Sequence, residues 1–166
     1  MFWSIGWGEN AVPQMNKGGK FIFGKSLIRE DLQLQFPPQA VREYAACSEG
    51  RVYLFTGARA TGGFCVTRRG LLLPSRLGNI LWESPDLREF TRPEGEFSAY
   101  KGRKYCWVSI SETGSIRLTE KMLAVLELAP GMELLSIRSS NIAFTMGAKG
   151  PLLERAKKYP GVIEVY

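Results

Sequence analysis

The feature that most constrains the fold of this chain is an internal repeat. The segment that begins at Ile28 aligns with the segment that begins at Ile110, and Leu34 meets Ile116 at the same offset of 82 positions. After single-residue shifts the alignment continues, mostly as a shared apolar pattern, past Phe64 and Phe144 until Leu72 and Leu73 meet the leucines at 152 and 153. Two copies of one pattern predict two copies of one supersecondary unit, and a short unit of this kind cannot bury its apolar face alone.

Both copies are predicted to fold in the order ββαββ. In the second copy, residues 105–110 and 115–118 are predicted strands, because they contain many aromatic and β-branched residues and flank a tight turn. A short helix is expected to begin at Thr119, which can cap it, and to end at a Pro-Gly pair. Two more strands are expected within residues 132–146, around a polar turn.

The first copy repeats this order, with a helix that opens on prolines, as the first helical turn tolerates. Its predicted elements are strands at 21–28, 33–36, 51–55 and 63–67 and a helix at 37–44. A unit of about 45 residues buries too little apolar surface to be stable alone, so each copy needs a partner. The duplicated chain supplies that partner in cis.

A resemblance to the AbrB/SpoVT swapped-hairpin family lies in ISETGSIRLTEKMLAVLELAPGMELLSI, from Ile110 to Ile137, and FPPQAVREY at 36–44 is similar, with Pro37 at the family's proline position. In that family two chains interlace hairpins to form one barrel, and a tandem chain resembles the MraZ-like arrangement. The resemblance implies a mainly β fold with short helices (α+β). Two ββαββ repeats would interleave in it as an intrachain pseudo-dimeric swapped-hairpin β-barrel.

The repeat also divides the chain. The predicted parts are an N-terminal arm (1–20), a first AbrB-like repeat (21–76), an acidic linker (77–104) and a second repeat with a C-terminal helix and strand (105–166). The helix is expected from Pro151 to about Lys158 and the strand to Tyr166. The standard hairpin domain does not require this C-terminal element, so we expect it to dock the halves together or to build a ligand pocket.

The resemblance implies a transcriptional regulator that contacts double-stranded DNA through basic side chains on its hairpins. The arginine that usually follows the turn glycine is replaced by Ser115 in the second copy and by Gln33 in the first, while Arg42 keeps a family basic position. The candidate DNA contacts are Lys25, Arg29, Arg42, Arg117 and Lys121, with Arg68 and Arg69 as secondary choices.

Charge allows a second class of function. The net charge is +6, and basic blocks at 25–76 and 101–166 flank an acidic block at 77–100. A basic surface attracts nucleic acid or another anion, or simply keeps a protein in solution. The missing turn arginines and the extra C-terminal element favour the alternative, a non-catalytic module that binds a small ligand or a partner protein.

Catalysis and metal binding are not expected. The chain has no histidine, and its three cysteines form no CxxC pair, so the usual catalytic triads and imidazole zinc sites are excluded. We expect no cofactor and no metal. Free cysteines among apolar neighbours, no signal-like N-terminus and no long apolar stretch predict a cytoplasmic protein outside the membrane.

Several motifs are expected to be coincidental. GKFIFGKS, from Gly19 to Ser26, satisfies the phosphate-loop pattern, but its middle residues are strand formers and no helix follows. The sequence GARATGG at 57–63 is predicted to be a hairpin connection, and the short basic runs at 101–104 and 157–158 solvated surface. The aromatic residues of the N-terminal arm are expected to pack on the barrel or on another subunit of a homo-oligomer.

Overall fold

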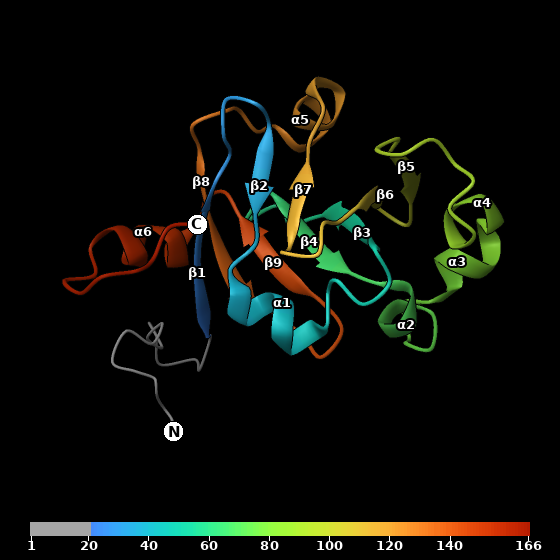
Figure 1. Ribbon diagram of the computed structural model, residues 1–166, viewed down its shortest axis with the longest axis horizontal. Helices are drawn as coiled ribbons and strands as arrows, with labels where there is room; N and C mark the ends of the chain where they lie inside the picture. Colours follow the sequence, from blue (N-terminus) through green and yellow to red (C-terminus); the bar gives the residue numbers. More distant parts are fainter. Residues whose placement is uncertain (1–20) are drawn as a thin grey trace.

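The structure, a computed structural model, describes residues 21–166 as an α+β fold (Figure 1). Antiparallel strands form a seven-stranded sheet and a separate two-stranded sheet, and short helices surround them. The predicted N-terminal arm, with its aromatic residues, lies outside the described residues. None of the helices within 21–166 is long and apolar enough to cross a membrane.

The strands and helices follow the predicted order in both copies. The strands are β1 (Ile22–Leu27), β2 (Gln33–Gln35), β3 (Arg51–Thr56), β4 (Phe64–Thr67), β5 (Ser98–Tyr100), β6 (Arg103–Ser109), β7 (Ser115–Arg117), β8 (Glu133–Arg138) and β9 (Phe144–Gly147). The helices are α1 (Pro38–Tyr44), α2 (Arg69–Leu72), α3 (Asn79–Glu83), α4 (Pro85–Arg88), α5 (Glu120–Leu126) and α6 (Pro151–Lys157). The units β1-β2-α1-β3-β4 and β6-β7-α5-β8-β9 are therefore both ββαββ.

The two copies share their sheets. The large sheet has the order β1-β8-β9-β4-β3-β6-β5, and the small one pairs β2 with β7. Four of the pairings, β1 with β8, β4 with β9, β3 with β6 and β2 with β7, join a strand of one copy to a strand of the other. The copies are thus not separate side-by-side domains. No ladder among the described strands joins β1 to β5, so the large sheet is open rather than a closed barrel.

Equivalent positions of the repeat pair with each other in the middle of both sheets. Leu34 lies opposite Ile116 in the small sheet, and Cys65 lies opposite Thr145 in the large one. A residue can lie opposite its own counterpart only where a twofold axis that relates the two copies passes between the paired strands. The strand pairing therefore has the pattern of a pseudo-dimer.

The main core lies between the large sheet and a layer that contains α1, α5 and the small sheet. Its centre is aromatic, because the Phe144 ring lies 5.3 Å from the centroids of Phe36 and Tyr44 and 6.4 Å from that of Phe23. Val52, Leu54, Val66 and Cys106 extend this core along the sheet. Alternation along each strand sends these side chains to one face and their neighbours to the other.

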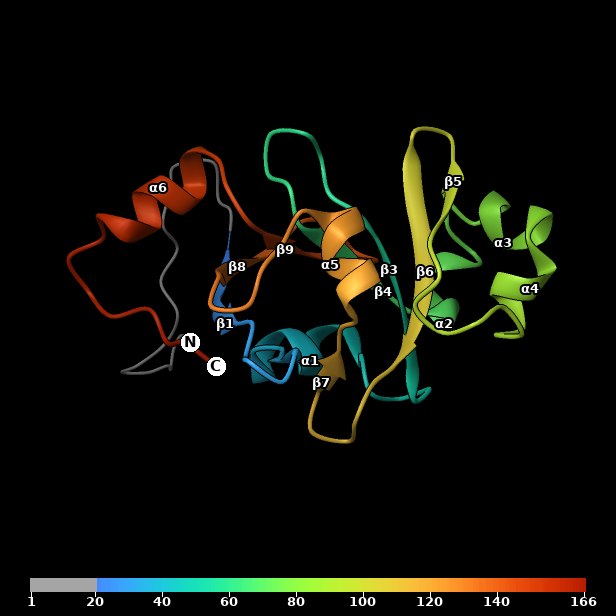
Figure 2. The ribbon, with the colours of Figure 1, turned by 90° about the horizontal axis from the view of Figure 1, so that it is seen from above.

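Helices cover the two ends of the opposite face, which we call the outer face. At one end α2, α3 and α4 bury Ile80, Leu81 and Leu87 against Tyr53; at the other end α6 packs on β1 and β8. Figures 1 and 2 show these helices at opposite ends of the molecule. The segment 77–104, predicted as an acidic linker, contains α3, α4 and β5 and contributes buried side chains to this cover. The middle of the outer face lies between the two groups of helices.

The structure contains the turns and helix caps that local sequence signals predicted. Thr119 caps α5, since its side chain accepts a hydrogen bond from the Met122 backbone N–H at 3.2 Å. Gly114 has a φ of 91°, and a Cβ there would lie 2.6 Å from Val41 Cγ2, so both the turn and the packing of α1 require glycine. Residues 57–63 connect β3 to β4, as predicted.

Two other predictions have clear outcomes. The phosphate-loop pattern is a coincidence, because Ile22–Leu27 form β1 and the Ser26 hydroxyl donates to the Gln35 carbonyl. The predicted C-terminal helix is confirmed as α6, but the strand to Tyr166 is reduced to one parallel bridge between Lys25 and Val165. Three backbone hydrogen bonds of 2.8–2.9 Å hold this segment to the free edge of β1, too few for a ladder.

Candidate functional site

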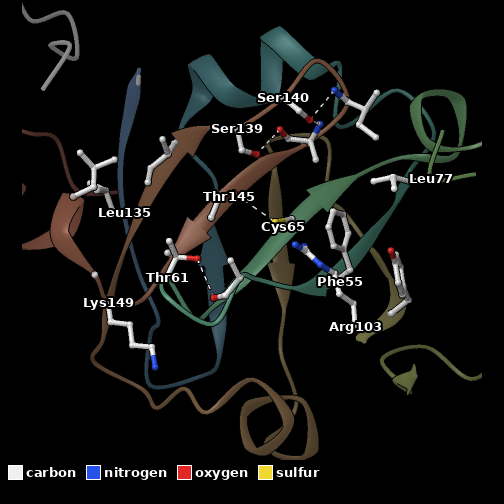
Figure 3. Close-up of a pocket in the computed structure, with 18 of the residues that line it drawn as sticks. Phe55, Thr61, Cys65, Leu77, Arg103, Leu135, Ser139, Ser140, Thr145 and Lys149 are labelled. Carbon is white, nitrogen blue, oxygen red and sulfur yellow. Dashed lines mark hydrogen bonds between the residues drawn. The ribbon is translucent and has the colours of Figure 1, made fainter. Parts of the chain in front are cut away.

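A cavity of about 700 Å³ occupies the middle of the outer face. Strands β3, β4, β9 and β8 form its floor, and α6 and the segment after α2 stand on either side (Figure 3). The cavity is centred on the strands where the two copies of the repeat meet. Pockets for small organic ligands have about this volume, with mostly apolar walls and a few polar groups.

The floor is apolar and is set by strand alternation. Phe64 and Phe144 point into the main core, so the next residues, Cys65 and Thr145, point into the cavity. Phe55 on β3 and Leu135 on β8 extend the floor to both sides. The Phe55 ring stacks on Tyr105 at 5.2 Å, which fixes an aromatic surface at one end.

The walls come from segments outside the regular strands. The wall residues are Ala58 and Thr61 of the β3–β4 connection, Leu77 and Asn79 after α2, Ser139, Ser140, Ile142 and Ala143 of the β8–β9 turn, and Gly150, Pro151, Leu152 and Leu153 at the start of α6. The Thr61 carbonyl accepts hydrogen bonds from the backbone N–H groups of Ala148 (2.8 Å) and Lys149 (3.0 Å). These bonds tie the loop of the first copy to the chain that enters α6, so both copies build the site.

The charges around the cavity have one sign. Five cationic and no acidic side chains occur among the described residues that line it: Arg76, Lys101, Arg103, Lys149 and Arg155. The lining residue Tyr100 donates a hydrogen bond from its hydroxyl to the Glu83 carboxylate at 2.8 Å, and Glu83 itself does not line the cavity. The cavity therefore favours a negatively charged occupant.

Arg103 differs from the other four cations. Its guanidinium lies 5.4 Å from the Phe55 ring centroid and donates a hydrogen bond of 3.1 Å to the Thr56 carbonyl. In Figure 3 the guanidinium lies beside Phe55 and is turned toward Cys65. No carboxylate of the described residues forms an ion pair with it. Arg103 is also half-buried, whereas the other four are exposed.

The cavity has the composition of a binding site. Burial raises the pKa of the Cys65 thiol, against a smaller opposite effect of hydrogen bonds from Thr145 and Arg103, so the thiol stays protonated at neutral pH. A protonated thiol is a weak nucleophile, and the side chain 3.4 Å from it is the Thr145 hydroxyl; the described residues that line the cavity include no carboxylate to act as a base. Residues 21–166 contain no cluster of Cys, Asp and Glu side chains suited to a metal ion.

Three of the predicted DNA contacts are used within the chain. Lys25 lies 3.7 Å from a Glu133 carboxylate oxygen, and Arg68 lies 2.8 Å from Glu49. Arg69 donates to the Arg88 carbonyl at 2.9 Å and lies over the Phe90 ring. These side chains anchor α2 and the edge of β1.

The other four predicted contacts are exposed on the side of the molecule opposite the cavity. Arg29 and Arg117 lie close together. The backbone N–H of Arg29 donates a hydrogen bond to the Gln33 carbonyl, and Gln33 lies opposite Arg117 in the small sheet. Lys121 opens α5 directly after β7, at the same end of the small sheet. Arg42 lies on α1, which follows the other end of β2. Acidic residues share these segments: Glu30, Asp31, Glu43, Glu120 and Glu127.

Sequence reasoning did not single out the residues of the cavity. The basic run that contains Arg103 and the loop 57–63 were both expected to be ordinary surface. The signal that pointed to a pocket was the C-terminal element after the second copy, which supplies α6. Nothing local marks Cys65 and Thr145, because they become neighbours only when β4 pairs with β9.

No model of a known protein family matches the chain, and no curated protein shows significant sequence similarity to it.

Proposed function

We propose that the protein is a non-catalytic binding module that holds a small organic molecule in the outer-face cavity. The observation that carries this proposal is a cavity of about 700 Å³ with an apolar floor and a few converging polar groups. The buried, protonated thiol and the absence of acid–base pairs on the floor favour binding over catalysis.

We infer that the scaffold is an AbrB-like swapped-hairpin pseudo-dimer. Four strand pairings between the copies support this, as does the pairing of Leu34 and Cys65 with their repeat counterparts. On this scaffold the segment from α2 to β5 and the helix α6 are additions that follow each ββαββ unit. Both additions line the cavity, so they turn the outer face of a hairpin scaffold into a ligand site.

The test is a thermal-shift screen of small metabolites on the full chain, followed by a variant that blocks the cavity. Ala58 is an exposed wall residue, so Ala58→Trp should obstruct the mouth with little effect on folding. The matched control is Ala124→Trp, on the exposed face of α5. A ligand at one hundred times its Kd stabilises a protein by about 2.7 kcal/mol.

We expect a compound that raises the melting temperature of the wild type and of Ala124→Trp, but not that of Ala58→Trp. A screen without any stabilising compound, or stabilisation that survives in Ala58→Trp, would contradict the proposal.

A second candidate function is DNA-binding transcriptional regulation, through the side of the molecule that carries α1, α5 and the small sheet. The observation in its favour is that Arg29, Arg117 and Lys121 are exposed at one end of the small sheet. The acidic residues of the same segments oppose it. If these cations bind phosphates, log affinity for duplex DNA falls linearly with log salt, and Arg117→Ala reduces the slope by about one. Arg155→Ala, on the cavity side, is the matched control; an unchanged slope for Arg117→Ala would refute this candidate.

A further inference from the structure

Resting on the proposed function, we infer that the ligand is an elongated organic anion whose acidic group is bound by Arg103 and whose apolar body lies on the floor.

The charge around the cavity selects an anion. Five cations and no acids line it among the described residues, although acids are common elsewhere in the chain. A neutral apolar ligand would cover the half-buried Arg103 without offering a partner to its charge. An anion offers them a partner and is also drawn in by the exposed cations at the rim, Arg76, Lys101, Lys149 and Arg155.

The hydrogen bonding selects Arg103 as the group that holds the acid. A guanidinium has five N–H donors, and those of Arg103 meet the Thr56 carbonyl and the uncharged Cys65 thiol, so no group of the described residues neutralises its charge. It is held in place by the Phe55 ring beside it and is turned into the cavity toward Cys65 (Figure 3). A planar fork of free donors matches a carboxylate, which it can bind through two parallel hydrogen bonds. The thiol of Cys65 offers no competing charge.

The shape of the floor selects a long body. β4 and β9 lie between Phe55 on β3 and Leu135 on β8, and Tyr105 of β6 continues the floor beyond Phe55. Three spacings between neighbouring strands amount to roughly 14 Å. Arg103 is at the Phe55 end, so a ligand held there has Cys65 of β4, Thr145 of β9 and then the apolar side chains of β8 before it. Fused aromatic rings or a medium-length acyl chain have this form.

The experiment compares 2-naphthoate with 2-naphthamide, and decanoate with decanol, by calorimetric titration of the full chain. Each pair has one apolar body with and without the negative charge. We expect the anion of at least one pair to bind at least tenfold more tightly than its neutral partner. Arg103→Met should abolish that preference. The control is Lys104→Met, which removes the same charge from the next residue of β6 without touching the cavity.

A further variant separates the effect of the positive charge at position 103 from that of the guanidinium fork. Arg103→Lys keeps the positive charge but lacks the fork, so we expect it to recover only part of the preference for the anion while its melting temperature without ligand stays near that of Arg103→Met.

Each outcome decides the matter. If neutral and anionic partners bind equally and Ala58→Trp abolishes both, the pocket stands and the inference of an anion is wrong. If the anions keep their preference in Arg103→Met, Arg103 is not their anchor. If none of the four compounds binds, this inference fails, while the metabolite screen decides separately on the proposed function.

Discussion

Phe64 and Phe144 allow the energetics of the repeat to be tested with a matched pair. They occupy equivalent positions in the two copies, on β4 and β9, and both side chains are 0% exposed. Replacing either by leucine removes the same atoms from the same core. The two changes should therefore cost the same free energy of unfolding unless their surroundings differ.

The surroundings do differ. The Phe144 ring is in contact with the rings of Phe23, Phe36 and Tyr44, at centroid distances of 5.3–6.4 Å, whereas Phe64 has no such aromatic contact among the described residues. An aromatic pair contributes about 0.5–1.5 kcal/mol beyond its buried area. Three pairs predict that Phe144→Leu costs at least about 1.5 kcal/mol more than Phe64→Leu.

Urea unfolding of the two variants, followed by circular dichroism, measures this difference. In a thermal melt of a chain of this size, the excess of about 1.5 kcal/mol should lower the Tm of Phe144→Leu by roughly 3–6 °C more than that of Phe64→Leu. Equal losses of stability for the two variants, with unchanged m-values, would refute the reasoning that aromatic contacts make the second copy's position the more important one.

Three further predictions concern single groups. The Ser136 hydroxyl is buried and has no hydrogen-bond partner among the described residues, so Ser136→Ala should stabilise the protein by about 1 kcal/mol in urea unfolding, and a loss of stability would contradict this. Burial raises the pKa of Cys106 to about 12 and that of Tyr44 to about 12, from 9.0 and 10.0, so the unfolded chain loses these protons first and stability should fall as pH rises above about 9. Cys106→Ala should flatten that decline, and an equally steep one in the variant would exclude the thiol as a cause. A thiol reagent should modify the partly exposed Cys47 before the buried Cys65 and Cys106, unless the native protein opens faster than it reacts.

Much of the fold follows from local sequence signals. Thr119 caps a helix because its hydroxyl meets a backbone N–H three residues later, and Gly114 allows a turn because its own φ is positive. Aromatic and β-branched residues on both sides of a tight turn identified β6 and β7 in the same way. These effects act within a few residues, so they can be recognised without knowing what packs against them.

Charge shows where local reasoning ends. Lys25, Arg68 and Arg69 were predicted to contact DNA on residue type and position, but each binds a carboxylate or carbonyl of the folded chain. Arg103, in a run expected to be ordinary surface, is the half-buried cation that faces the cavity. A basic side chain looks the same in a sequence whether it is paired, exposed or buried.

By itself the sequence determined the duplication, the ββαββ order and the need for the copies to share a core, because apolar periodicity and unit size require them. Only the tertiary structure decided which strands meet. Cys65 and Thr145 are 80 residues apart and become neighbours through the pairing of β4 with β9. The cavity above them exists because α6 and the helices after α2 cover the two ends of the outer face and leave its middle to four strands that two copies provide together.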